Sequence, residues 1–156
     1  MKFEHIVVVN EPENPLVDDL SREELWFGLL CRAEDPAAFL PGLERCVIVE
    51  RADNILVRDL HFGSVCIRDT VAMQPMMSIS FSSTATREHA GGQLTITIEE
   101  PEPGRLALRF QYRTTLPDTA TDPDGKYAEY VKSAYHSADL ETVRVIRQII
   151  DSARMQ

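Results

Sequence analysis

The sequence predicts an α+β fold in which one curved antiparallel sheet packs on a long C-terminal helix. Residues 44–114 alternate between apolar and polar side chains, with the period of two that is typical of strands. Turns rich in Gly, Pro, Asp and Asn separate these strands, and such short links join antiparallel neighbours. Residues 126–154 follow the helical period of 3.6 instead.

The length and composition are those of one globular domain. The chain has 156 residues, 44% hydrophobic and 26% charged, and we expect residues 1–156 to bury a single core. No apolar run has the length of a membrane span or a signal peptide, so no membrane span is predicted and the cytoplasm is the expected compartment. The net charge is −9 without a Lys/Arg cluster, which argues against nucleic acid as a partner.

The N-terminal part predicts one strand and two short helices. Residues 3–9 are rich in β-branched side chains and predict the first strand. The first helix begins at Ser21, because Ser21 and Glu24 have the spacing of a capping box. Pro36 ends this helix, and a second, shorter helix is expected over residues 37–40.

The middle of the chain predicts a meander with one covered face. A two-residue turn at Gly63-Ser64 places Arg58 opposite Asp69. One face then carries apolar side chains and this single opposite-charge pair, whereas the other face is polar. Because such a sheet curves, space on its concave side becomes a pocket. The six strands are expected over residues 44–51, 55–62, 65–73, 77–84, 94–99 and 105–114.

The C-terminal region predicts a loop followed by a helix. Residues 117–125 are polar and rich in Pro and Asp, and we expect them to form the loop. In the helix, the apolar stripe that begins at Tyr127 does not align with the stripe that begins at Leu140. A bend or break near Ser137 would bring both stripes onto the sheet.

These elements and several local motifs resemble a known superfamily. Residues 20–29 read LSREELWFGL, Pro36 and Phe39 follow, and Phe62-Gly63 comes later. The chain resembles the START-like (SRPBCC) superfamily of birch-pollen-allergen proteins, polyketide cyclases and lipid-transfer domains, in a branch similar to the acetylaranotin-cluster proteins. The resemblance covers the whole chain. It implies a helix-grip fold of about seven strands round the C-terminal helix, with a cavity for hydrophobic ligands between sheet and helix, and it supplies no catalytic residue set.

The predicted binding site combines three polar residues with an apolar lining. Arg58 and Asp69 are expected either to form a structural ion pair or to anchor a ligand, with Arg58 presenting its planar fork to a carboxylate or enolate. Acid–base catalysis by Asp69 is a third interpretation. The phenol of Tyr112 is placed to bond a ligand oxygen or a backbone group. The apolar lining is expected from Trp26, Leu56, Leu60, Ile67, Ile79, Phe81, Ile96, Leu108 and Phe110.

The histidines and cysteines predict no cofactor and no metal site. The four histidines share no metal-ligand spacing, and the three cysteines include no Cys-x-x-Cys pair. His5 is in phase with Phe3 and Val7, and we expect it to face inward as a hydrogen-bonded core histidine.

Three classes of function remain open on this evidence. Binding of a small hydrophobic molecule, a lipid or an aromatic, polyketide-like metabolite, is favoured over enzymatic activity. The second class is a metal-independent cyclase- or hydrolase-like enzyme, which needs an internal acid or base, and Asp69 is the candidate for it. The third is a protein-interaction module that uses the apolar groove. The sequence predicts neither the ligand nor the oligomeric state.

Overall fold

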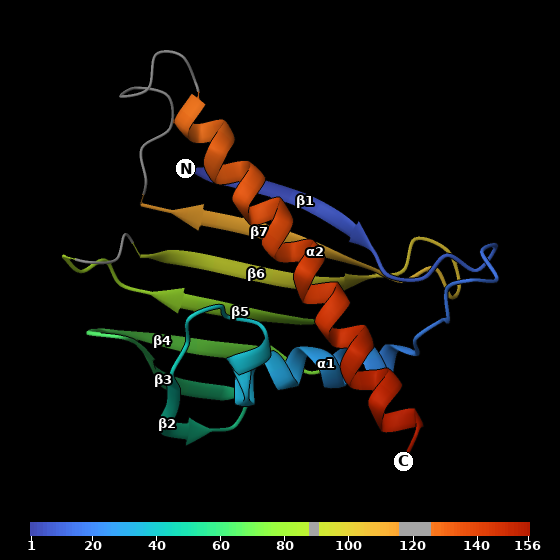
Figure 1. The fold of residues 1–156 in the computed structure, drawn as a ribbon, viewed down its shortest axis with the longest axis horizontal. Helices are drawn as coiled ribbons and strands as arrows, with labels where there is room; N and C mark the ends of the chain where they lie inside the picture. Colours follow the sequence, from blue (N-terminus) through green and yellow to red (C-terminus); the bar gives the residue numbers. More distant parts are fainter. Residues whose placement is uncertain (88–90, 116–125) are drawn as a thin grey trace.

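A seven-stranded antiparallel sheet organises the protein, and helix α2 crosses one of its faces diagonally (Figure 1). The computed structural model describes residues 1–87, 91–115 and 126–156. The strand order is β1-β7-β6-β5-β4-β3-β2, so the first strand pairs with the last. The predicted fold class is therefore confirmed. The strands are β1 (Lys2–Val8), β2 (Arg45–Ala52), β3 (Ile55–Phe62), β4 (Val65–Gln74), β5 (Ser78–Ser83), β6 (Gly92–Glu99) and β7 (Ala107–Thr114).

Two short helices connect β1 to β2, as predicted: α1 (Arg22–Glu34) and the 3-10 turn η1 (Pro36–Ala38). The capping box at Ser21 is confirmed. Its hydroxyl accepts a hydrogen bond from the Glu24 amide at 3.0 Å, and the Glu24 carboxylate accepts one from the Ser21 amide at 2.9 Å. These bonds satisfy two backbone donors at the helix start. The same carboxylate binds Arg154 near the C-terminus, which ties the two helices together.

The hairpin of β3 and β4 has the predicted register. Arg58 opposes Asp69, and Phe62 opposes Val65 across the turn. Gly63 has a φ of 58° in this turn, a conformation that glycine adopts without strain. Because side chains alternate along a strand, this register puts the Arg58–Asp69 pair on the inner face together with the apolar residues.

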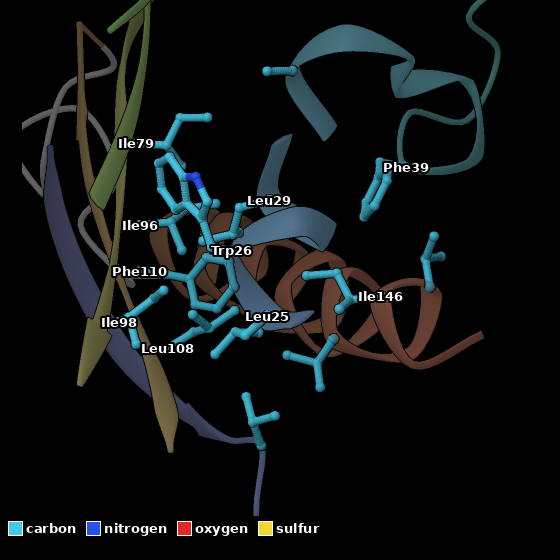
Figure 2. Close-up of a cluster of buried hydrophobic side chains, with 14 of the residues drawn as sticks. Leu25, Trp26, Leu29, Phe39, Ile79, Ile96, Ile98, Leu108, Phe110 and Ile146 are labelled. Atoms are coloured by element: carbon cyan, nitrogen blue, oxygen red, sulfur yellow. The ribbon is translucent and has the colours of Figure 1, made fainter. Parts of the chain in front are cut away.

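The core lies between the inner face of the sheet and the two helices. Helix α1 approaches α2 closely at Gly28, where any Cβ would overlap the side chain of Ile146. Each large apolar side chain that is fully buried there contributes about 1.5–3 kcal/mol to folding. Figure 2 shows this packing for Leu25, Trp26, Leu29, Phe39, Ile79, Ile96, Ile98, Leu108, Phe110 and Ile146.

Helix α2 runs unbroken from Lys126 to Arg154, so the break considered near Ser137 does not occur. Asp139 and Thr142, only 1% and 3% exposed, continue the buried stripe through the middle of the helix. A pattern that counts apolar residues alone misses these two, whereas it includes Leu140, which is 47% exposed. One continuous helix therefore keeps a single buried face.

The loop predicted over residues 117–125 lies outside the described residues. Within the described part of the chain, neither helix combines the length and the apolar character needed to cross a membrane.

Candidate ligand-binding site

A pocket of about 200 Å³, called here the inner pocket, opens between the inner face of the sheet and the helices. A wider hollow of about 430 Å³ lies toward the outer face, but mostly polar and charged side chains line it. Small-molecule sites are mostly apolar with a few convergent polar groups, which favours the inner pocket. Its lining consists of Arg32, Leu40, Arg58, Leu60, Asp69, Phe81, Ser83, Gly91, Gly92, Gln93, Leu94, Tyr112, Thr114 and Tyr135.

Five of the twelve predicted site residues line the inner pocket: Arg58, Leu60, Asp69, Phe81 and Tyr112. The other seven lie elsewhere. Ile67 is half-buried on β4. The rest belong to the packed hydrophobic core and are not among the residues that line the inner pocket, and they are Trp26, Leu56, Ile79, Ile96, Leu108 and Phe110.

Arg58 and Asp69 form a fully buried ion pair that joins β3 and β4 to α1. The Nε and Nη2 groups of Arg58 donate to the two carboxylate oxygens of Asp69 at 2.8 and 2.6 Å. Its Nη1 group donates to the backbone carbonyls of Arg32 and Ala33, each at 3.1 Å. These carbonyls end α1 and have no donor within the helix. The geometry therefore favours the structural interpretation of this pair over ligand anchoring.

Arg32 is the second arginine of the inner pocket, and sequence reasoning did not select it. Its guanidinium carbon lies 4.5 Å from the centroid of the Phe81 ring, in a cation–π contact. Its Nε is buried and has no hydrogen-bond partner among the described residues. Burial lowers the pKa of this guanidinium. The sequence feature that points to Arg32 is its position three residues after Leu29, which places it on the buried face of α1.

A second polar cluster lies where α2 crosses β1 and β7. One carboxylate oxygen of Asp139 accepts a hydrogen bond from the Tyr112 hydroxyl. The other lies 2.9 Å from Nε2 of His5 without the alignment of a hydrogen bond. Both ring nitrogens of His5 are buried and lack a hydrogen bond to any described residue, so the expectation of a hydrogen-bonded core histidine is wrong. His136 lies beside this ring, with 4.7 Å between the ring centroids.

Burial sets the protonation of this cluster. It raises the pKa of Asp139 to about 7, against the opposing effects of the Tyr112 hydrogen bond and the Arg32 charge. Burial and the charge of His136 lower the pKa of His5. Burial and the Asp139 charge raise the pKa of the Tyr112 phenol. Near neutral pH, Asp139 is therefore partly protonated, whereas the imidazole of His5 and the phenol of Tyr112 stay neutral.

The sequence pattern indicates Asp69 as the candidate internal acid and does not single out Asp139. The missing signal was a carboxyl residue at a buried position of the helical stripe, four residues after Tyr135 and three before Thr142. Within the described ranges, no three His, Cys, Asp or Glu side chains gather as they would to hold a metal ion.

Residues 7–153 match the model of a protein family described as acetylaranotin biosynthesis cluster protein L. The chain belongs to this family. The match spans nearly all the elements described above, including both walls of the inner pocket, and it confirms the branch that the sequence motifs predicted. No curated protein matches the sequence.

Solved structures show the same fold for this member of the acetylaranotin cluster protein L family. The di-domain ARO/CYC StfQ from the steffimycin biosynthetic pathway has a TM-score of 0.65 at 16% identity, over 97% of this chain and 51% of that chain. The family member thus spans about half the length of StfQ. Zhui aromatase/cyclase from Streptomyces sp. R1128 has a TM-score of 0.61 at 17% identity, over 96% and 95%. Human STARD10 has 0.63 at 10% identity, over 99% and 66%. At these identities the likeness establishes the START-like fold alone.

Proposed function

We propose that this protein binds a small hydrophobic molecule in the inner pocket. The observation that carries the proposal is the composition of its wall, in which Leu40, Leu60 and Leu94 face a few convergent polar groups. Apolar walls with few polar contacts are what small-molecule sites share. A dry cavity of about 150 Å³ accommodates benzene, so about 200 Å³ suits a compact ring system or a short chain.

Two aromatic side chains of the wall favour a flat ligand. Tyr112 and Tyr135 stack with 4.0 Å between their ring centroids and 6° between their planes. Both line the pocket, so this stacked pair offers an aromatic surface to a ligand. Two proteins of the same fold, StfQ and Zhui, are aromatase/cyclases. This supports an aromatic or polyketide-like ligand over a long-chain lipid.

Calorimetric titration with 2-naphthamide, a neutral bicyclic probe, tests the proposal. We expect one equivalent to bind. Leu60→Trp fills the pocket and should weaken binding at least about tenfold, the loss that about 1.4 kcal/mol of contact energy produces. The matched control is Ile55→Trp on the same strand, where the side chain is 43% exposed. Absence of binding, or equal losses in the two variants, would contradict the proposal.

A second function, metal-independent acid–base catalysis in the same pocket, is favoured by the position of Tyr112. Its side chain lines the pocket and donates its hydrogen to Asp139. When Asp139 takes up a proton, that carboxyl becomes a donor to the phenol oxygen, and the phenol hydrogen is then available to a ligand carbonyl. Such a donor promotes enolisation, in which the carbonyl oxygen receives the hydrogen bond and the α-proton leaves to water.

Proton exchange at the α-carbon of 2-tetralone in D₂O, followed by NMR, tests this second function. The protein should accelerate the exchange, with a greater rate below pH 7 than above it. Tyr112→Phe should remove the acceleration, whereas Tyr130→Phe, which changes a phenol that is 70% exposed on α2, should not. Exchange at the rate of buffer alone would leave only the binding function.

A further inference from the structure

We infer that the ligand carries an anionic oxygen and that Arg32 binds it. The inference rests on the proposed binding function and deepens it, because it names the chemical class of the ligand. It also assigns the anchoring role to a different arginine from Arg58, the one that the sequence indicated.

The two arginines of the inner pocket differ in how far their donors are used. Four hydrogen bonds from Arg58 end on Asp69 and on the last carbonyls of α1. Arg32 lines the same pocket, yet its Nε is buried without a hydrogen bond to any described residue. Asp69 and Asp139 act on Arg32 through their charges, but neither forms an ion pair with it among the contacts of the described residues. Arg32 is therefore the guanidinium that remains able to receive a ligand.

A partly buried cation without a direct ion-pair partner is costly, and the surroundings of Arg32 compensate it only in part. The ring of Phe81 faces the guanidinium at 4.5 Å, and the C-terminal end of α1 adds a favourable dipole. The nearby charge of Arg58 opposes both effects. A carboxylate or enolate oxygen would supply the partner that no described side chain provides, and the planar fork of arginine suits two such oxygens.

The pocket limits the rest of the ligand to a compact apolar skeleton. About 200 Å³ accommodates a short chain or a small ring system but not a long acyl chain. Two sources share this chemistry, a short aliphatic acid and an aromatic acid or enolate. The protein itself carries a net charge of −9. Its overall field therefore does not attract anions, and any preference for them must come from the pocket.

Calorimetric titrations at pH 6 with 2-naphthoate, octanoate and the neutral 2-naphthamide test the inference. At this pH the two acids are ionised and Asp139 is mostly protonated, so that its charge does not repel them. We expect 2-naphthoate to bind about tenfold to a hundredfold more tightly than 2-naphthamide, as charge-assisted hydrogen bonds provide. Arg32→Met should abolish this preference, so that the variant binds the acid no more tightly than the amide. The control is Arg144→Met, which removes the same charge from an exposed site on α2.

Each outcome decides the inference. Equal affinity of the wild type for naphthoate and naphthamide, without any Arg32-dependent affinity for octanoate, overturns it, although binding of the amide keeps the proposed function. A preference for the acid that survives Arg32→Met overturns it as well, and absence of binding by all three probes overturns both. An Arg32-dependent gain for octanoate alone identifies an aliphatic source, and a gain for naphthoate alone identifies an aromatic one. If Arg32→Met does not unfold cooperatively on heating, Arg32→Gln carries the same expectations.

Discussion

The two buried carboxylates beside the inner pocket differ in the charge of their hydrogen-bond donors. Asp69 is 7% exposed and receives two hydrogen bonds from the guanidinium of Arg58. Asp139 is 1% exposed and receives one hydrogen bond, from the neutral phenol of Tyr112. Its second oxygen lies beside His5 without a hydrogen bond among the described residues. Burial is similar at the two positions, and the difference lies in the partners.

This difference distinguishes a carboxylate that stays charged as part of the fold from a carboxyl group that can take up a proton near neutral pH. A buried carboxylate with a complete set of charged donors is held as part of the fold, and breaking that set is expensive. A buried carboxylate with only a neutral donor is destabilised by the loss of water. Burial therefore favours its protonated form, and its pKa rises toward neutrality. Four substitutions would sharpen or break this comparison.

The largest effect is expected for Arg58→Met. This change leaves Asp69 buried without a counter-ion and removes the donor from two carbonyls of α1. The free energy of unfolding should fall by about 3–5 kcal/mol, measured by urea denaturation at pH 7. The double variant Arg58→Met/Asp69→Leu should recover most of this loss. A fully stable Arg58→Met protein that no longer binds ligand would return Arg58 to the role of anchor.

A smaller effect with a distinct pH dependence is expected for Asp139→Asn. The folded-state pKa of Asp139, about 7, lies above its ordinary value near 4, so the native state holds the proton more tightly. Wild-type stability from this group is complete below about pH 4 and is lost as the pH rises to about 7. The variant should therefore gain about 2 kcal/mol relative to the wild type between pH 4 and pH 8, with allowance for solvent screening.

Urea denaturation of both proteins at several pH values measures this gain. All other titratable groups are present in both, so their difference reports Asp139 together with its coupling to the neighbouring His5. Parallel pH profiles would show that folding does not raise the pKa of Asp139, and the contrast with Asp69 would then fail.

Tyr112→Phe should lower the free energy of unfolding by about 1 kcal/mol above pH 7, the usual net contribution of one hydrogen bond. The Tyr112 hydroxyl stabilises the ionised form of Asp139, so its removal should raise the pKa of that carboxyl further above about 7. A titration of carboxyl ¹³C shifts by NMR measures this change. An unchanged or lower pKa would mean that the hydroxyl does not bond the carboxylate in solution.

The smallest effect is expected for Arg68→Met. Arg68 binds Asp59 at 2.7 Å across the same two strands, but on the outer face, where the Arg68 side chain is 64% exposed. Solvent screens such pairs, so the loss should stay between about 0 and 1 kcal/mol in the same urea assay. A loss equal to that of Arg58→Met would show that strand pairing, rather than burial, determines the cost.

The sequence by itself determined the order of elements, the start of α1 and the register of the β3–β4 hairpin. These features depend on local signals: a capping box at Ser21, a turn at Gly63-Ser64 and an alternation with a period of two. Such signals act between residues that are close in the chain, so one sequence contains all that is needed to recognise them. The position of the Arg58–Asp69 pair on the inner face follows from the same register.

Only the tertiary structure decided which polar groups are satisfied. The partners of Arg58 include carbonyls on α1, and the partner of Tyr112 lies on α2, each more than twenty residues away in the chain. The continuity of α2 also depended on distant contacts, because Asp139 counts as part of the buried stripe only once Tyr112 and His5 face it. Hydrogen bonding and desolvation depend on everything that surrounds a group, and they distinguish a structural arginine such as Arg58 from an available one such as Arg32.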